Sequence, residues 1–462
     1  MRPRNEASWL DVGYSKSGSI ILQDYGRLRE LVSLLAYPNN QYPLLSVFLG
    51  GKNKDLALRG IFTQNNIRRT RSAARIGLRL DSKSADTDVP ILFADGGVGP
   101  CRNEKSNVSG AQEHPLAWDI LPTDDALQLV YARLLFLFAD VVCIFANDFP
   151  NLPSVAQFLV NCVSLQITST LPAAVRPRVL VVLVDKPNCT NSYGPDIERF
   201  YQELHQLGSC RPPSLFHCVN LLYLDSSYSE LTRYDRLRSW IQRQRDEVRS
   251  VRRENWAQLS APHLTGFFES AIRQLGTREY NKFSFVQVSR EGNPVAAGLS
   301  NHITQYMDFG LRDGCSIDTL LSGMASALLM DNYVPGMIIL DPQAVFRALY
   351  RPAIFKAFRA FRARHELVQL TMDLVSQAES EFVQQFHVLQ DSKQSSIEFR
   401  RQQILSKSHE LGLMQSGQCG PPSTPRPVTI VSATSARNFS ECRHLTRSTD
   451  SRYQRAFFAI LK

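Results

Sequence analysis

The chain has 462 residues, of which 44% are hydrophobic and 10% aromatic, enough for a sizeable core and for more than one domain. Its formal net charge of +9 allows an anionic partner without demanding a specific nucleic acid. Its nine cysteines include no CxxC pair, and its histidines show no metal-ligand spacing, so we predict reduced cysteines and no metal site. Because the N-terminus has no apolar core, we expect no signal peptide and a cytoplasmic location.

Five short apolar runs predict the strands of a sheet that is covered on both faces. They lack alternation, and helical patterns at 124–138, 153–166 and 195–207 separate several of them. The runs are LLSVFL (44–49), ILFA (91–94), VVCIFA (141–146), VLVVLV (179–184) and VNLLYL (219–224). This order predicts an α/β fold with a mainly parallel, doubly wound sheet, in which ligands bind beyond the carboxyl ends of the strands.

The remaining segments complete the predicted domain organisation. We expect an N-terminal extension over residues 1–39, the α/β domain over 40–228 and a mainly helical domain over 229–415. Within the helical domain, FSFVQV (283–288) is the last plausible strand. Residues 416–462 are rich in Pro, Ser and Thr, which predicts a disordered tail.

The first predicted strand runs into the turn FLGGKNKDLAL. A phosphate-binding P-loop needs G-x-x-x-x-G-K-[ST], whose backbone amides surround the phosphates and whose lysine reaches the β- and γ-phosphates. With Gly50 as the first glycine, Asp55, Leu56 and Ala57 replace the second glycine, the lysine and the hydroxyl. An ordinary turn is therefore favoured over a loop that uses unusual lysines. The vestigial nucleotide-binding positions at this strand end are Gly50, Gly51, Lys52 and Lys54.

Two later strand ends carry fragments of the same kind of site. Asp95 opens the sequence DGGV, which partly fits the magnesium-side Asp-x-x-Gly of a GTPase because Val98 replaces the glycine. Asp185 and Lys186 follow the fourth run in DKPN, where Asn and Asp are interchanged relative to the base-reading N-K-x-D. The order of these fragments along the sheet predicts a degenerate GTPase-like domain, with Asp95, Asp185 and Lys186 as further vestigial positions.

The same DGG sequence also begins the D-G-G-G-x-R-G turn of a patatin-like lipase. That enzyme requires a serine in G-x-S-x-G at a sharp strand-to-helix turn. No such motif occurs, and the nearest segments, GLSNH (298–302) and GCSID (314–318), lack the closing glycine. We therefore predict no lipase nucleophile and no catalytic residue in this chain.

Two helical segments are rich in basic residues. Residues 233–255 hold eight arginines and four acids, which predicts either a solvated helix with one buried stripe or a weak contact with an anionic membrane through Arg233–Arg253. In AIFKAFRAFRARHELVQL (353–370), Phe355, Phe358 and Phe361 recur every third residue among basic residues. Docking of these phenylalanines into the helical core is favoured over a membrane surface.

Several phrases resemble the N-terminal half of large fungal proteins that join a P-loop GTPase-like domain, a RING finger and a patatin-like phospholipase domain. They cover roughly residues 40–415 and include YPLLSVFLG, DVPILFADGG, YARLLFLFADVVCIFANDF, AAVRPRVLVVLV, SAPHLTGFFESAIRQL and ALLMDNYVPGMIILDPQAVFRALYRP. The resemblance implies a P-loop-NTPase-like sheet. The RING and patatin regions have no counterpart here, which suggests a truncated gene model.

These features predict a non-catalytic, GTPase-like regulatory or interaction module of an intracellular fungal protein, with an unidentified protein partner and no cofactor. A GTP-binding switch that uses Mg²⁺, an atypical phosphate loop and Asp95 is the alternative. A further alternative is a fragment of a patatin-like phospholipase of lipid metabolism whose catalytic domain is missing.

Overall fold

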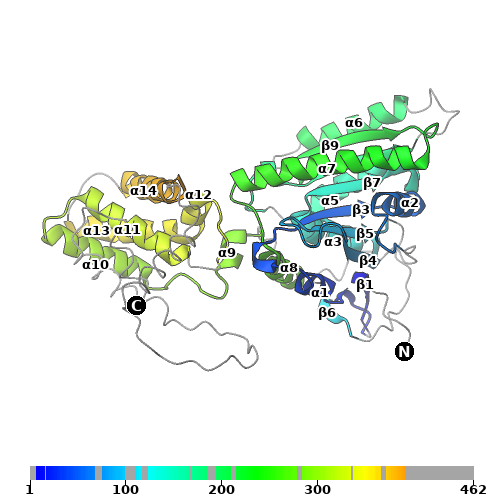
Figure 1. Cartoon of the computed structure of the whole chain (residues 1–462). Helices are drawn as coiled ribbons and strands as arrows, with labels where there is room; N and C mark the ends of the chain where they lie inside the picture. The colour runs from blue at the N-terminus through cyan, green and yellow to red at the C-terminus, as the bar shows by residue number, and fades with distance from the viewer. Residues whose placement is uncertain are drawn as a thin grey trace. The chain divides into compact units, whose positions relative to one another are not determined.

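The structure is a computed structural model that divides into two compact units, Met1–Ser289 and Arg290–Lys462 (Figure 1). Each unit is described by itself. The residues described are 7–15, 17–67, 75–98, 110–116, 123–165, 169–184, 194–209, 215–277, 283–333, 337–365 and 371–391. The predicted disordered tail, 416–462, lies outside them, as do Asp185 and Lys186.

A nine-stranded mixed sheet forms the centre of the first unit, in the order β6-β2-β1-β4-β5-β3-β7-β8-β9. The strands are β1 (Ser8–Tyr14), β2 (Ile20–Asp24), β3 (Leu44–Leu49), β4 (Arg75–Leu80), β5 (Ile91–Gly96), β6 (Gln112–Pro115), β7 (Val141–Phe145), β8 (Arg178–Val184) and β9 (Cys218–Leu224). The five apolar runs predicted from the sequence are β3, β5, β7, β8 and β9, which pair in parallel. The α/β class is therefore confirmed.

The other four strands pair antiparallel and were not expected. Two of them, β1 and β2, lie within the expected N-terminal extension 1–39. Their sequences mix apolar and polar residues, and even Asp11 is buried, where it pairs with Arg75 of β4 at 3.2 Å. A strand that keeps its charges through ion pairs gives no continuous apolar run, which is why the sequence pattern missed this half of the sheet.

Helices cover both faces of the parallel half of the sheet. One core cluster joins Phe48, Phe93 and Cys143 of the strands to α2 (Lys52–Ile61) and α7 (Glu230–Glu254). Figure 1 shows α7 lying across this face of the sheet. The other helices of the unit are α1 (Arg27–Ser33), α3 (Thr123–Val130), α4 (Phe136–Phe138), α5 (Leu152–Leu165), α6 (Gly194–Ser209), α8 (Ala261–Leu275) and α9 (Phe285–Ser289), with a π-helical turn at Tyr131–Leu135. Cys143 and Cys162 are buried free thiols, as predicted.

The helices α7 and α8 belong to the first unit, so the unit boundary falls later in the chain than the domain boundary expected at 228. The predicted strand 283–288 is wrong, because α9 begins at Phe285 and only Phe283 forms an isolated β-bridge in the described residues, with Ser169. The hydroxyl of Ser284 accepts a hydrogen bond from the N–H of Gln287 at 3.2 Å, which is the geometry of a helix N-cap. In the sequence, the alternation of apolar and polar residues in FSFVQV favoured a strand, so the capping role of Ser284 was not predicted.

The second unit is helical in the described residues, as expected. It contains α10 (Leu299–Arg312), α11 (Ile317–Asn332), α12 (Pro342–Val345), a π-helical turn (Phe346–Tyr350), α13 (Arg351–His365) and α14 (Thr371–Asp391). α11 packs on α14, and α13 packs on α10 and α14. α10 continues through Gly310, where a side chain would collide with Leu320 of α11. Among the described residues, no helix is both long and apolar enough to span a bilayer.

Candidate functional site

The strand order identifies the place where a ligand would be expected. From β3 the chain first builds β4 and β5 on one side and then β7, β8 and β9 on the other. Such a reversal of strand order opens a crevice at the carboxyl end of the first strand, where doubly wound proteins bind ligands. The turn Gly50-Gly51 lies at this end of β3, and α2 begins at Lys52.

The loop between β3 and α2 consists of Gly50 and Gly51, so it is shorter than the eight-residue P-loop motif G-x-x-x-x-G-K-[ST]. Gly50 has φ of 154°, a conformation that residues with a side chain rarely adopt. A Cβ at this position would lie 2.6 Å from the Oδ2 atom of Asp148. Because the helix starts two residues after Gly50, Lys54 lies on the first turn of α2 rather than in a loop. Because the loop is this short and Gly50 has no side chain, the carboxylate of Asp148 can lie at the start of α2.

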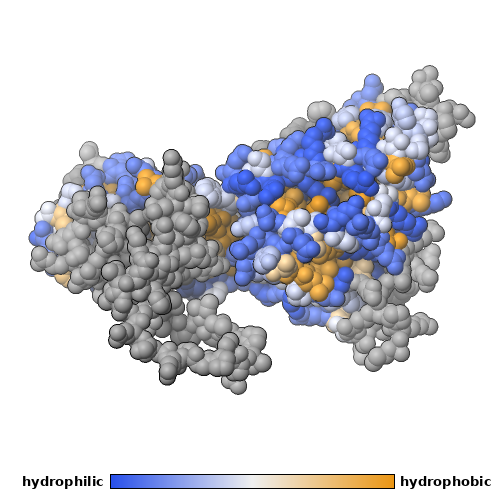
Figure 2. All heavy atoms as spheres, in the orientation of Figure 1, coloured by the Kyte–Doolittle hydropathy of each residue, from blue (hydrophilic) through white to orange (hydrophobic). Residues whose placement is uncertain are grey.

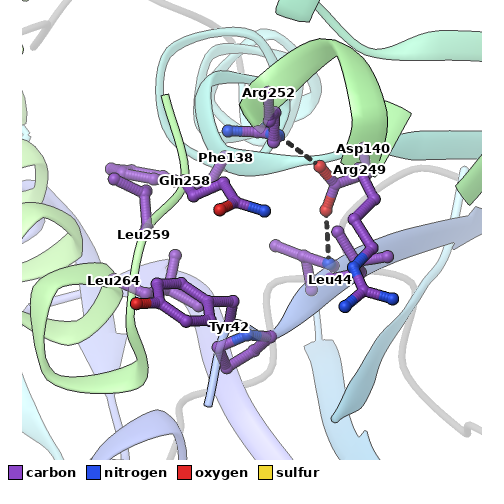
Figure 3. A pocket seen from close by; sticks show the side chains of 11 residues that line it. Tyr42, Leu44, Phe138, Asp140, Arg249, Arg252, Gln258, Leu259 and Leu264 are labelled. Carbon is purple, nitrogen blue, oxygen red and sulfur yellow. Dashed lines mark hydrogen bonds and ion pairs between the residues drawn. The ribbon is translucent and has the colours of Figure 1, made fainter. Parts of the chain in front are cut away.

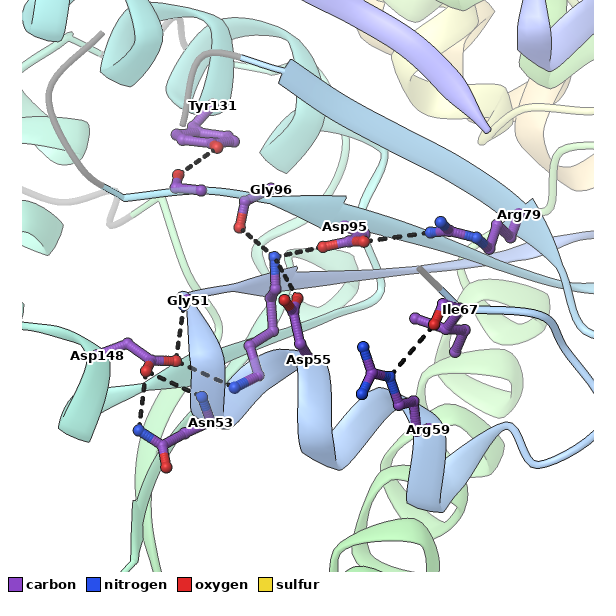
Figure 4. A network of polar contacts seen from close by, with 12 residues as sticks. Gly51, Asn53, Asp55, Arg59, Ile67, Arg79, Asp95, Gly96, Tyr131 and Asp148 are labelled. Carbon is purple, nitrogen blue, oxygen red and sulfur yellow. Dashed lines mark hydrogen bonds and ion pairs between the residues drawn. The ribbon is translucent and has the colours of Figure 1, made fainter. Parts of the chain in front are cut away.

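The carboxylate of Asp148 occupies the N-terminus of α2 (Figure 4). Its Oδ2 accepts the backbone N–H of Gly51 at 2.7 Å and that of Lys54 at 3.0 Å. Its Oδ1 accepts the backbone N–H of Asn53 at 3.0 Å and the side-chain amide of Asn53 at 2.8 Å. We call the three backbone amides of Gly51, Asn53 and Lys54 the amide site. Helix N-termini of this kind attract anions, and here the anion belongs to the chain itself.

A buried ionic cluster lies directly behind the amide site. The Nζ atom of Lys54 pairs with Asp95 of β5, lies 3.5 Å from Oδ1 of Asp55, and donates a hydrogen bond to the carbonyl of Gly96 at 3.1 Å. Arg79 of β4 approaches the other oxygen of Asp95 at 3.2 Å. The side chains of Lys54 and Asp95 are each only 1% exposed, so both charges depend on their partners.

The parallel register explains why these residues meet. Phe48 pairs with Asp95 and Leu49 with Gly96, so the end of β5 lies beside the start of the loop. On the other side Leu49 pairs with Ile144 of β7, which places the residues after β7, including Asp148, beside Gly50. Gly96 has no room for a side chain, because a Cβ would lie 2.5 Å from the hydroxyl of Tyr131, which donates to the carbonyl of Gly97.

The ionisation of this cluster is shaped by burial. Desolvation raises the pKa of Asp55 above its usual range, the nearby Lys54 ammonium acts in the opposite direction, and the Asp95 carboxylate adds to the rise. In the described part of the chain, no group of three or more His, Cys, Asp or Glu side chains could hold a metal ion. The arrangement can bind an anion at the amide site and neutralise charge beside it.

The structure brings together four of the residues predicted from the sequence: Gly50, Gly51, Lys54 and Asp95 lie within one network. Lys52 is the first residue of α2 and is exposed. The sequence patterns gave Asp148, Asn53 and Arg79 no role. The position of Asp148 just after an apolar strand is the only available signal, since its partners are 94–97 residues away in the sequence.

A small pocket at the opposite end of the sheet has a structural ion pair at its base (Figure 3). Asp140, which precedes β7, accepts the backbone N–H of Leu45 at 2.7 Å and pairs with Arg252 of α7 at 2.6 Å. Burial raises the pKa of Asp140, an effect that the Arg252 guanidinium opposes. Tyr42, Phe138, Gln258, Leu259 and Leu264 contribute to the lining. The pair fastens α7 to the sheet.

Much of the basic charge of α7 is used inside the unit. Arg245 is buried and donates to the hydroxyl of Ser46 at 2.9 Å, and burial lowers its pKa to about 10. Arg238 donates to the carbonyls of Gly60 and Ile61 at the end of α2. Over residues 233–254 of this helix the exposed charged side chains are three arginines and four acids: Arg236, Arg243, Arg253, Asp235, Asp246, Glu247 and Glu254. The exposed positive and negative charges of this segment are therefore nearly balanced. The membrane contact predicted for Arg233–Arg253 stays a prediction.

Comparison of the chain with protein-family models and with curated proteins finds no match.

Proposed function

We propose that the first unit is a degenerate, P-loop GTPase-like domain that does not catalyse nucleotide hydrolysis and acts as a regulatory or interaction module in the cytoplasm. The observation that carries this proposal is the carboxylate of Asp148, which accepts hydrogen bonds from Gly51, Asn53 and Lys54 at the switch point of the sheet. A phosphate-binding loop would use the same type of donors for a phosphate group. A phosphate would have to displace this carboxylate or lie beside a like charge.

The contacts of the Lys54 side chain also support a domain that does not hydrolyse nucleotides. In a functional phosphate loop the lysine must reach the phosphates. Here its side chain is 1% exposed, and its Nζ atom is held by Asp95 and by the carbonyl of Gly96. Turning it toward a ligand would break its pair with the buried Asp95 carboxylate, and breaking a buried pair of this kind costs about 3–5 kcal/mol. The ammonium therefore serves the fold in place of a nucleotide.

Isothermal titration tests the proposal. We expect no heat of binding when the full chain is titrated with GTP, GDP or ATP in the presence of Mg²⁺. Micromolar binding that Asp95→Asn abolishes would contradict it, because that result requires a working magnesium-side carboxylate. Asp225→Ala is the matched control, since Asp225 also follows a strand but accepts a local hydrogen bond, from the backbone N–H of Ser227.

A GTP-binding switch is the second candidate, and one observation favours it. The backbone donors, Lys54 and Asp95 are all present, and only one side chain fills the amide site. If Asp148 exchanges with a nucleotide phosphate, Asp148→Ala will bind Mg²⁺–GTP more tightly than the wild type, and the wild type will bind it measurably. Under the leading proposal the wild type shows no binding, whatever the variant does.

A further inference from the structure

The helix α13, in the second unit, carries a basic surface whose residues take no part in the amide site. It contains five arginine or lysine residues and no acidic residue over Arg351–His365. Arg364 pairs with Asp308 of α10, and that carboxylate also contacts His365. The remaining exposed cations are Arg351, Lys356, Arg359 and Arg362. Among the residues that the structure describes, Arg351, Lys356 and Arg359 form no ion pair or hydrogen bond, so their charges are available to a partner.

Three of these cations and one aromatic ring form a stripe along the helix. At 3.6 residues per turn, Arg351, Phe355, Lys356 and Arg359 lie within about two fifths of the helix circumference. They extend over roughly 12 Å, from the rise of 1.5 Å per residue. Phe358 is fully buried, whereas Phe355 is 41% exposed. The predicted docking of the phenylalanines into the core thus holds for Phe358 and Phe361, and Phe355 faces outward.

A comparison with α7 shows why this surface is distinctive. Both helices read as basic in the sequence, but α7 exposes acids between its arginines and turns several arginines inward. Figure 2 shows the polar surface of the first unit on the side where α7 lies. On α13 the apolar side is the buried one, formed by Ile354, Ala357, Phe358 and Phe361, and the outward side is left with cations and Phe355.

We propose that α13 binds the anionic surface of a lipid bilayer, with Arg351, Lys356 and Arg359 at the phosphate groups and the Phe355 ring among the headgroups. Each basic residue near such a surface contributes roughly fivefold to the partition coefficient, by the usual value of about 1 kcal/mol per Lys or Arg. A row of exposed cations along one side of a helix can lie against the flat, anionic surface of a bilayer. Single-stranded nucleic acid is more often retained by a charged groove, which makes it the less suitable partner.

Co-sedimentation with lipid vesicles tests the proposal on the full chain. The probe is phosphatidylcholine vesicles with and without phosphatidylserine. We expect binding only to vesicles that contain phosphatidylserine, with affinity that falls as salt rises. The triple variant Arg351→Glu, Lys356→Glu, Arg359→Glu is expected to lower the partition coefficient by at least about tenfold. Phe355→Ser is expected to weaken binding without changing its salt dependence.

The matched control changes the same charge elsewhere. Arg236→Glu, Arg243→Glu and Arg253→Glu alter three exposed arginines of α7, so equal losses in both triple variants would show a net-charge effect and overturn the proposal. A triple alanine variant of α13 keeps the helix propensity and covers the case in which the glutamates impair folding. Absence of selectivity for phosphatidylserine would also overturn it. The proposal would also be overturned if single-stranded RNA bound more tightly through the same residues and displaced the vesicles.

Discussion

The strand β7 is flanked by two aspartates that have opposite roles. Asp140 precedes it and reaches the amino end of β3, whereas Asp148 follows it and reaches the loop after the carboxyl end of β3. Asp140 accepts one backbone N–H, from Leu45, and is neutralised by Arg252. Asp148 accepts three backbone amides and forms no ion pair within the described part of the chain.

The difference shows how similar chemistry can serve structure at one end of a sheet and resemble a binding site at the other. A buried carboxylate with a guanidinium partner fixes two elements together, and replacing only one partner leaves a charge without compensation. A carboxylate held by helix amides instead occupies a place that another anion could take. A variant that breaks the buried pair is therefore expected to lose more stability than one that disturbs the carboxylate at the amide site.

The Asp140–Arg252 pair is expected to be a strong determinant of stability. Arg252→Met leaves the 2% exposed Asp140 without its nearest cation, and we expect the free energy of unfolding to fall by about 3–5 kcal/mol. Urea denaturation measures the change. Arg199→Ala is the control, because the Arg199–Glu203 pair lies on the surface of α6 and is expected to contribute less than about 0.5 kcal/mol. Comparable losses in both variants would contradict the structural role.

Gly50 tests how closely Asp148 fills the site. Gly50→Ala imposes a strained φ and places a Cβ 2.6 Å from Oδ2 of Asp148, so we expect a loss of about 1–3 kcal/mol of unfolding free energy. In the double variant with Asp148→Ala the part of this loss caused by the collision with Oδ2 should disappear, whereas the 3.1 Å contacts with the Cβ atoms of Lys54 and Phe145 remain. Strictly additive losses in the double-mutant cycle would show that Asp148 does not occupy this position.

Asp55 gives a smaller effect that depends on pH. Its pKa is raised by burial in the folded chain, so its contribution to stability is fully present below the ordinary aspartate pKa and is lost as pH rises through the folded value. Asp55→Asn cannot titrate and escapes this loss. The stability of the variant relative to the wild type should therefore increase from acidic to neutral pH in urea denaturation. A relative stability that decreases with pH would mean that the Lys54 ammonium outweighs desolvation.

Sequence patterns predicted the parallel half of the sheet because β3, β5, β7 and β8 are buried on both faces and read as continuous apolar runs, and the less buried edge strand β9 is also mostly apolar in sequence. They also located Gly50, Lys54 and Asp95 at strand ends. The antiparallel strands escaped notice because ion pairs such as Asp11–Arg75 let charged residues lie in the sheet. The role of Asp148 could not be predicted, because it depends on the register between β3 and β7 and on a loop two residues long.

Amide hydrogen exchange at the start of α2 tests the central claim most directly. If the carboxylate of Asp148 holds the backbone amides of Gly51, Asn53 and Lys54, these three will exchange more slowly in the wild type than in Asp148→Ala. Amides later in α2, such as that of Leu58, will exchange alike in both proteins, and Mg²⁺–GTP will leave the wild-type rates unchanged. Equal exchange at the three amides in the two proteins, or added protection by the nucleotide in the wild type, would contradict an internally occupied site.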